Sequence, residues 1–315
     1  MNSTAALLKR SFAASTLVLM FAIAASAETP FDFDGDGKTD ISIVRHFAPS
    51  GAEWWISKST SSEVTVSVFG NSSDVPTPAD FTGDGKTDIA VYRRNTGTWW
   101  ILRSEDATHY ALQFGLNNDS PMPADYDGDG RADPTVFRWQ TGLWYIARSS
   151  GGVAVIPFGG TQDAAVSADY DGDGTADLAV ARAVAGNQIE WWVQRSTAGV
   201  LTTRFGTPHD ATVPGDYTGD GKADIAVYRG LTGQWFVLRS EDSSYSILNW
   251  GMGGDTPAPG DYDGDGKFDA AVFRSSDATW YIDRTGGSGP LVRRFGVATD
   301  WPVPNNYVKG WATIE

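Results

Sequence analysis

The chain of 315 residues contains no cysteine, so disulfide bonds cannot stabilise its fold. Basic residues are also scarce, because 24 Lys and Arg stand against 39 Asp and Glu and give a formal charge of −15 at pH 7. Nucleic acid is therefore not an expected partner, since no basic stripe is present to neutralise phosphates. Only three histidines occur, and none of them recurs in a pattern with serine or aspartate.

Long hydrophobic runs are absent except at the N-terminus. Lys9 and Arg10 precede an apolar run over about residues 12–25, which ends at the small residues Ala25-Ser26-Ala27. This pattern is typical of a secretory signal peptide, so we predict a leader over residues 1–27 and a single domain over residues 28–315. The expected location is extracytoplasmic, either secreted or periplasmic. No transmembrane span is expected after the leader is removed.

Aspartate, in contrast, is abundant and recurs in six nine-residue loops. Each loop begins and ends with Asp, and successive loops start 44 to 48 residues apart. A period in the mid-forties indicates one supersecondary unit copied in series. The loops are Asp32–Asp40, Asp80–Asp88, Asp125–Asp133, Asp169–Asp177, Asp216–Asp224 and Asp261–Asp269.

The oxygen spacing within each loop predicts a calcium site. Positions 1, 3, 5 and 9 carry oxygen-bearing side chains, position 6 is always Gly, and position 7 would contribute its backbone carbonyl. We expect about six Ca²⁺ ions, with two weaker sites where Thr82 and Thr218 replace the position-3 aspartate. The candidate ligands are Asp32, Asp34, Asp36, Lys38, Asp40, Asp80, Thr82, Asp84, Lys86, Asp88, Asp125, Asp127, Asp129, Arg131, Asp133, Asp169, Asp171, Asp173, Thr175, Asp177, Asp216, Thr218, Asp220, Lys222, Asp224, Asp261, Asp263, Asp265, Lys267 and Asp269.

Short alternating segments between the loops favour an all-β fold. In the second copy, strands are expected over residues 88–93, 99–103 and 109–114, and a fourth over residues 119–125, which leads into the next loop. Four short strands per unit of about 45 residues describe the blade of a β-propeller. Pairs of prolines in the fourth segments, such as Pro76 and Pro78, favour an edge strand beside the central channel.

Three further residue types recur in all six copies. The arginine that closes the first strand is expected to stack on the tryptophan of the second strand. Each tryptophan either packs between blades or belongs to a ring of ligand-binding indoles. The aspartate six residues before each loop either pairs with an arginine or lines the channel mouth. The tryptophans are Trp54, Trp99, Trp144, Trp191, Trp235 and Trp280; the arginines are Arg45, Arg93, Arg138, Arg182, Arg229 and Arg274; the aspartates are Asp74, Asp119, Asp163, Asp210, Asp255 and Asp300.

The repeat resembles the FG-GAP or VCBS repeat of integrin-α-type β-propellers. The resemblance is carried by Asp-x-[Asp/Thr]-x-Asp-Gly-x-x-Asp in all six loops and by an aromatic-Gly pair before each following inner strand, such as Phe69-Gly70. It implies calcium held in blade loops, an extracytoplasmic location, and a role in adhesion or ligand binding.

The number of copies predicts six blades, with seven blades as the alternative. The first copy lacks a full inner strand of its own, and residues 300–307 repeat that strand after the sixth copy. We therefore expect the C-terminal segment to pair with the first blade and to close the ring.

No catalytic constellation is apparent, so we expect a monomeric, non-enzymatic interaction or adhesion module with an unknown extracellular protein or glycan ligand. The alternatives are a lectin and a calcium-dependent glycan lyase. A sugar site would use non-repeated aromatics such as Trp139, Trp250, Trp301 and Trp311. Because the calcium loops are nearly identical, the partner surface is expected on the opposite face.

Overall fold

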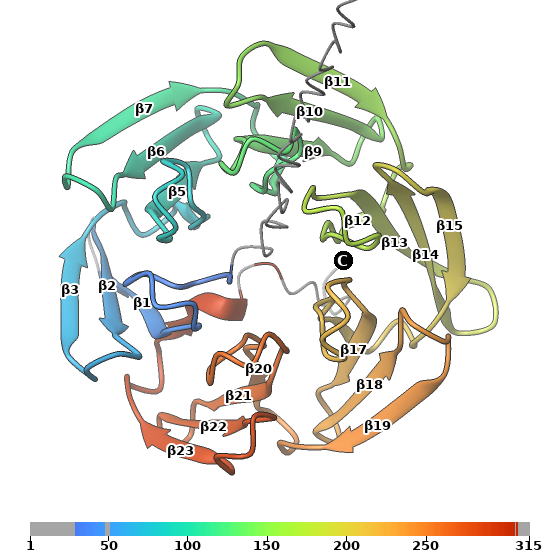
Figure 1. Ribbon diagram of the computed structural model, residues 1–315. Coiled ribbons are helices and arrows are strands. Elements are labelled where there is room, and N and C mark those ends of the chain that lie inside the picture. The colour runs from blue at the N-terminus through green and yellow to red at the C-terminus, as the bar shows by residue number, and fades with distance from the viewer. Residues whose placement is uncertain (1–28, 48–50, 306, 308–315) are drawn as a thin grey trace, which may run out of the picture.

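The computed structural model describes residues 29–47, 51–305 and 307. These residues form six four-stranded antiparallel sheets arranged as blades around a central channel (Figure 1). The six-bladed all-β propeller is thus confirmed. The predicted leader over residues 1–27, the segment after Tyr307 and Trp311 lie outside the described residues. No described helix is long and apolar enough to cross a bilayer.

Each blade runs from a two-residue inner strand to a longer outer strand. From the channel outward, the first blade contains β24 (Trp301–Pro302), β1 (Ile41–Phe47), β2 (Gly51–Ser57) and β3 (Val64–Val68), and the second contains β4 (Val75–Pro76), β5 (Ile89–Arg93), β6 (Thr98–Leu102) and β7 (His109–Gln113). The third blade contains β8 (Ser120–Pro121), β9 (Thr135–Arg138), β10 (Leu143–Ala147) and β11 (Val153–Pro157), and the fourth contains β12 (Ala164–Ala165), β13 (Leu178–Val184), β14 (Gln188–Arg195) and β15 (Gly199–Arg204). The fifth blade contains β16 (Ala211–Thr212), β17 (Ile225–Arg229), β18 (Gln234–Leu238) and β19 (Tyr245–Asn249), and the sixth contains β20 (Thr256–Pro257), β21 (Ala270–Arg274), β22 (Thr279–Asp283) and β23 (Leu291–Arg294).

The C-terminal segment closes the ring as predicted. β24 pairs with β1 in the register Ile43↔Pro302 and Val44↔Trp301, so the last inner strand completes the first blade. The short 3₁₀ helix η1 (Val303–Asn305) follows, and its Asn305 donates a hydrogen bond from Nδ2 to the carbonyl of Pro257 in the sixth blade. The N- and C-terminal parts of the chain are thereby joined across the boundary between the sixth and first blades.

The recurrent tryptophans serve packing. All six indoles are at most 1% exposed, and each indole nitrogen donates a hydrogen bond to the carbonyl of the aromatic residue that ends the same blade, at 2.8–3.2 Å. Burial of a large ring together with a satisfied N–H makes each indole an anchor of its blade. The alternative reading, in which these six indoles form a ligand-binding ring, is therefore wrong.

The predicted stacking partner of the recurrent arginines is also wrong. The six guanidinium carbons lie 4.1–5.4 Å from the ring centroid of the residue after each buried tryptophan. The register explains the difference, because Arg93 lies opposite Thr98, and side chains two residues apart share a face. The stacked rings are Trp55, Trp100, Tyr145, Trp192, Phe236 and Tyr281.

The recurrent aspartates pair with these same arginines, as one of the two interpretations predicted. The N···O distances of the six pairs are 2.6–2.9 Å. Each carboxylate also accepts a backbone N–H from the residue three positions earlier, as Asp74 does from Asn71. Each pair thus fixes the connection between one blade and the next.

Small residues before the loops reflect crowding near the channel, and this makes one substitution especially informative. A Cβ added to Gly215 would lie 2.1 Å from a ring carbon of Phe268 in the next loop. We expect Gly215→Ala to destabilise the fold by about 1–3 kcal/mol through overpacking, measured by chemical denaturation. Gly230→Ala is the matched control, because its nearest contact would be 3.9 Å away. If Phe268→Ala does not relieve the loss in the double variant, the steric explanation fails.

Candidate metal centres

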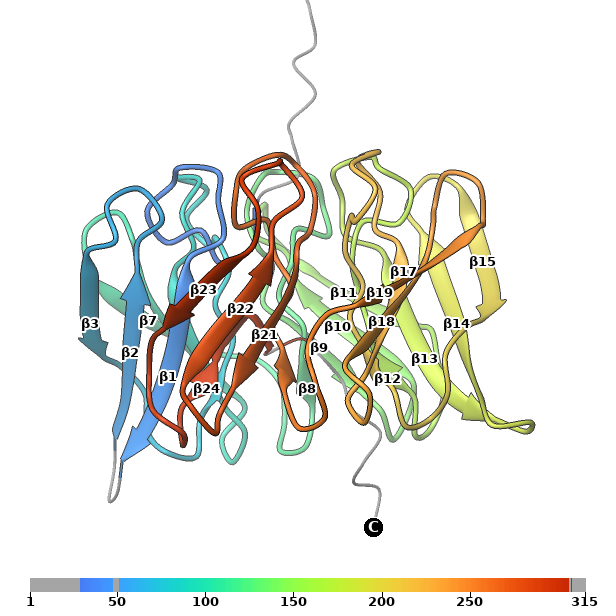
Figure 2. The same ribbon diagram turned by 90° about the horizontal axis from the view of Figure 1, so that it is seen from below.

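The six acidic loops gather on one face of the disc. Five of the loops connect an inner strand to the strand that follows it, and the first loop leads directly into β1. All six therefore project from the same end of the blades, opposite the turn between β13 and β14 (Figure 2). In five of the blades, the last aspartate of the loop makes a backbone bridge with the residue just before the loop, as Asp88 does with Ala79. The loop is thereby closed at its base.

The aspartate at position 1 shapes the loop from inside. In the first loop, Asp32 accepts backbone N–H groups from Gly35 at 2.6 Å and from Gly37 at 2.7 Å. The same two bonds occur in the other five loops. Both glycines have positive φ values, near 80°, which glycine adopts without steric cost. In four loops the curled backbone brings the carboxylates at positions 1 and 3 together with the carboxylate at position 5 or position 9.

The aspartate at position 3 has an oxygen that no protein group satisfies. In four loops, the Oδ1 atoms of Asp34, Asp127, Asp171 and Asp263 are buried and have no hydrogen-bond partner among the described residues. A buried carboxylate oxygen without a donor is costly, and a cation at this position could satisfy it. The same four loops bring three carboxylates within 4.8 Å of one another: Asp32, Asp34 and Asp36; Asp125, Asp127 and Asp133; Asp169, Asp171 and Asp177; and Asp261, Asp263 and Asp265.

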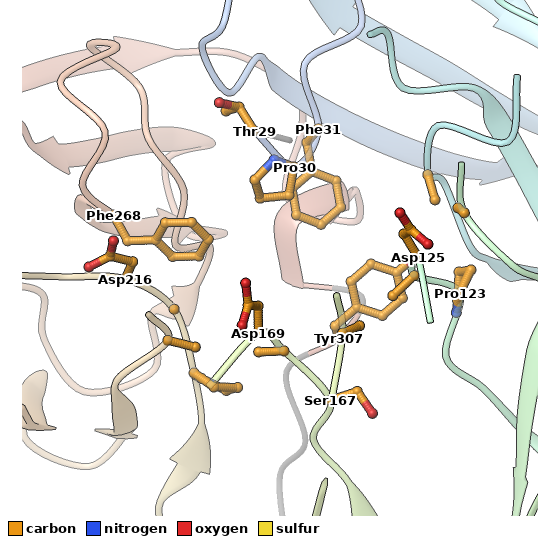
Figure 3. Close-up of a pocket in the computed structure, with 18 of the residues that line it drawn as sticks. Thr29, Pro30, Phe31, Pro123, Asp125, Ser167, Asp169, Asp216, Phe268 and Tyr307 are labelled. Carbon is orange, nitrogen blue, oxygen red and sulfur yellow. The ribbon is translucent and has the colours of Figure 1, made fainter. Parts of the chain in front are cut away.

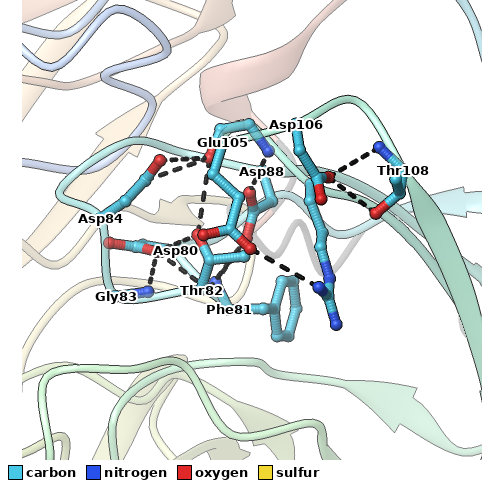
Figure 4. A network of polar contacts seen from close by, with 11 residues as sticks. Asp80, Phe81, Thr82, Gly83, Asp84, Asp88, Glu105, Asp106 and Thr108 are labelled. Carbon is cyan, nitrogen blue, oxygen red and sulfur yellow. Dashed lines mark hydrogen bonds and ion pairs between the residues drawn. The ribbon is translucent and has the colours of Figure 1, made fainter.

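The two threonine-containing loops differ from the other four in the contacts of their position-3 side chains. Thr82 and Thr218 direct their hydroxyls to the position-1 carboxylate of their own loops, at 3.2 and 3.5 Å. The second loop still contains Asp80, Asp84 and Asp88 (Figure 4). Among the described residues, however, these three carboxylates are not grouped as closely as those of the other four loops. These two loops therefore offer a cation less negative charge than the other four.

The aspartate at position 9 is the most deeply placed ligand candidate. Burial raises the pKa of Asp40 to about 7, that of Asp269 to about 7 and that of Asp177 to about 6, and neighbouring carboxylates add to the effect. Burial also raises the pKa of the equivalent Asp88, Asp133 and Asp224. A cation held between these groups would reverse the shift, because an opposite charge favours the ionised form.

The position-7 carbonyl is available in every loop. No hydrogen bond from the described part of the chain reaches the carbonyl oxygens of Lys38, Lys86, Arg131, Thr175, Lys222 or Lys267. With carboxylates at positions 1, 3, 5 and 9, this oxygen completes the hard donor set that calcium prefers. The residues present therefore fit the ion, and calcium would supply the positive charge that the loop otherwise lacks.

One recurrent residue that hydrogen-bonds to the loop carboxylates was not predicted from the sequence. In each blade, the strand that carries the buried tryptophan leads into a Lys or Arg followed by a hydroxyl residue. These hydroxyl residues are Ser59, Ser104, Ser149, Ser196, Ser240 and Thr285. The N–H of this residue donates to the position-9 carboxylate at 2.7–2.9 Å in all six blades. In five blades its hydroxyl also donates to the position-5 aspartate. The repeated Lys/Arg-Ser/Thr pair in the sequence was the available signal.

The loops are also joined to one another in a closed circle. The position-8 N–H of each loop donates to the position-1 carbonyl of the preceding loop, at 2.6–2.7 Å. The circle closes between the ends of the chain, because Thr39 of the first loop donates to Asp261 of the last. We call this set of six hydrogen bonds the loop ring. Each position-7 side chain also lies beside the position-4 glycine of the preceding loop, as Lys38 lies beside Gly264.

Inside the loop ring, the channel holds a cavity of about 620 Å³ (Figure 3). Its walls combine prolines and alanines of the segments that join the inner strands to the loops with residues of the loops themselves. Tyr307 enters the channel, stacks on Phe31 at a centroid distance of 5.9 Å, and donates from its hydroxyl to the carbonyl of Pro78. Residues from near both ends of the chain thus meet in the channel.

The non-repeated tryptophans do not converge on one site. Trp139 is 39% exposed and Trp301 47% exposed, and they belong to different blades. Trp250 donates from its indole nitrogen to the carbonyl of Tyr281 and so connects the fifth and sixth blades.

Comparisons with known proteins agree with this architecture. A profile of the FG-GAP-like repeat family matches residues 32–91, 80–133 and 169–227, which together make up just over half of the chain. A search of curated proteins gave no match.

Solved structures align with this chain at low sequence identity. A lectin from Agrocybe aegerita that recognises non-reducing terminal N-acetylglucosamine aligns with a TM-score of 0.50 and 17% identity, over 85% of this chain and 81% of that chain. Apo AztD from Citrobacter koseri aligns with a TM-score of 0.49 and 11% identity, over 82% and 81%. Virginiamycin B lyase from Staphylococcus aureus aligns with a TM-score of 0.47 and 7% identity, over 83% and 84%. Taken with the match of the family profile and the six acidic loops, the fold places this chain in the FG-GAP repeat family of β-propellers.

Proposed function

We propose that this protein is an exported, calcium-binding propeller that acts as a non-enzymatic interaction module. The observation that carries the calcium assignment is the unpartnered buried carboxylate oxygen that recurs at position 3 of four loops. The export assignment rests on the N-terminal sequence pattern, and a role in adhesion rests on the resemblance to integrin-type repeats.

Calcium titration by isothermal calorimetry on metal-free protein tests the site assignment. We expect about six bound ions, of which the two in the threonine-containing loops bind more weakly. Thr82→Asp and Thr218→Asp should each tighten one site by roughly tenfold, because each restores a charged ligand. Asp127→Thr is the matched reverse change and should weaken one site by a similar factor. A count of one or two ions, or threonine variants that leave every site unchanged, would refute the assignment.

The partner surface is proposed on the face opposite the calcium loops. The hairpin of β13 and β14 projects on that face (Figure 2), and its strands contain 7 and 8 residues, whereas those of the β5–β6 hairpin contain 5 and 5. Variable extensions on a rigid scaffold are the usual sites of recognition.

A loop exchange tests this surface once an array of glycans and extracellular proteins has identified a ligand. Replacement of residues 183–188 by the short turn of the second blade should reduce ligand binding at least about tenfold and leave the melting temperature nearly unchanged. Loss of binding after surface changes beside the calcium loops, with the exchanged hairpin fully active, would place the partner on the other face.

Carbohydrate binding is the second candidate for this interaction. It is supported by the half-buried aromatic rings that the six arginines stack upon at the blade junctions, because aromatic rings suit the apolar faces of sugars.

A further inference from the structure

A second cavity lies outside the acidic loops, at the boundary between the sixth and first blades. Its volume is about 400 Å³, which falls within the range of small-molecule sites, roughly 300–1,000 Å³. We call it the seam cavity, since the outer strands β23 and β3 that flank it come from opposite ends of the chain (Figure 1). It is lined by Arg45, Trp55, Val64, Arg294, Phe295 and Gly296.

Arg45 presents a fixed donor to this cavity. Its Nε and Nη2 atoms donate to the two carboxylate oxygens of Asp300, both at 2.8 Å, and its guanidinium lies 4.8 Å from the ring centroid of Trp55. Within the described residues, Nη1 has no acceptor. Asp300 therefore fixes one edge of the Arg45 guanidinium and Trp55 fixes one face. The remaining edge, at Nη1, is held in place to donate to a ligand.

Arg294 is exceptional among the six equivalent positions. The residue before each aromatic-Gly pair is Val68, Gln113, Pro157, Arg204, Asn249 or Arg294, so only two of the six are basic. Arg204 is neutralised by Glu190, which lies opposite it on the neighbouring strand, at 3.0 Å. Arg294 lies opposite Thr279 and has no carboxylate partner among the described residues. Arg45 is paired with Asp300 and lies opposite Glu53, so Arg294 is the guanidinium of this cavity that lacks a carboxylate partner in the described part of the chain.

The remaining walls suit a ring. Phe295 supplies aromatic surface and Val64 supplies aliphatic surface, while the ring of Trp55 lies under the Arg45 guanidinium and its indole nitrogen donates to Glu53 at 3.0 Å. Two guanidiniums recognise a carboxylate or sulfate, while the aromatic wall covers the apolar face of a pyranose. We propose that the seam cavity binds an acidic sugar residue, with its anionic group held between Arg45 and Arg294. This proposal rests on the interaction function above, but it does not require calcium at any particular loop.

The test measures binding of methyl glucuronide, glucose 6-sulfate and methyl glucoside to the calcium-loaded full-length protein, by calorimetry and saturation-transfer NMR. We expect at least one of the two anionic sugars to bind about tenfold or more tightly than the neutral glucoside, because a charge-assisted contact is lost in the latter. Arg294→Gln should weaken anionic-sugar binding by about tenfold or more. Thr279→Glu should do the same, because it gives Arg294 the partner that Arg204 already has.

Arg204→Gln is the matched control, since it removes the paired arginine of the fourth blade, and it should leave the affinity unchanged. Melting temperature and calcium stoichiometry are measured for each variant, so that misfolding or failure of the calcium assignment is distinguished from loss of the sugar site. Equal affinity for the neutral and anionic sugars, no binding of any of them to folded protein, or equal losses in Arg204→Gln and Arg294→Gln would overturn the proposal. Binding of an acidic peptide in place of every sugar would overturn it as well.

Discussion

Removal of calcium should lower the melting temperature of this protein by more than about 10 °C. At ~1 mM calcium and a Kd of ~10⁻⁴ M, each bound ion contributes roughly 1.4 kcal/mol of stability by mass action. Four such sites would contribute about 6 kcal/mol, and the two weaker sites, with a Kd of ~10⁻³ M, would add about 0.4 kcal/mol each, so the sum is comparable to the whole stability of a typical domain. Without the ion, the unpartnered oxygens of Asp34, Asp127, Asp171 and Asp263 and the crowded carboxylates around them destabilise the folded state.

The measurement is a thermal melt of protein shown to be metal-free, with and without added calcium. Magnesium at the same concentration is the control, because its preference for a smaller octahedral site should recover little of the loss. An unchanged melting temperature in excess EDTA would show that the loops are acidic turns that do not depend on a metal.

Removal of the ring-closing segment should have a similarly large effect. Truncation after Thr299 deletes β24, the Asp300 partner of Arg45, the hydrogen bond of Asn305 and the half-buried ring of Tyr307. The summed loss of hydrogen bonds and buried aromatic surface is at least about 4 kcal/mol. It also exposes the inner edge of β1, which invites pairing with a second chain. We expect a large fall in denaturant midpoint together with dimers or aggregates in size-exclusion chromatography.

Truncation after Tyr307 is the matched control, because every contact just named is retained. The two truncated proteins should differ clearly in midpoint and in oligomeric state. Equal midpoints would mean that the first blade is stable without its inner strand.

Features set by local repetition could be predicted from the sequence. The acidic loops, the four-stranded blades and the closing segment each depend on patterns within one repeat, and the structure has six blades closed by β24. The aromatic partners of the arginines could not be predicted, because they depend on strand register. A shift of one residue moves the contact from the buried Trp99 to Trp100 on the other face.

The candidate metal sites could be predicted only in part, because some of their contacts also depend on how separate segments pack together. The side chains of a loop such as Asp32–Asp40 are close in sequence, so their oxygen spacing is visible there. Ser104 reaches Asp84 and Asp88 from another turn, 20 and 16 residues away, and the contact is set by how the hairpin packs over the loop. The seam cavity and the loop ring depend on the placement of neighbouring blades, which no single repeat encodes.

The loop ring has a consequence for how calcium binds. The carbonyl that accepts each inter-loop hydrogen bond belongs to the position-1 aspartate, which is itself a proposed ligand, as in the bond from Thr87 to Asp32. An ion that orders one loop therefore also fixes the acceptor for the next, and neighbouring sites share the entropic cost of ordering. Calcium binding around the disc should accordingly be cooperative, with the sites filling over a narrower concentration range than independent sites would.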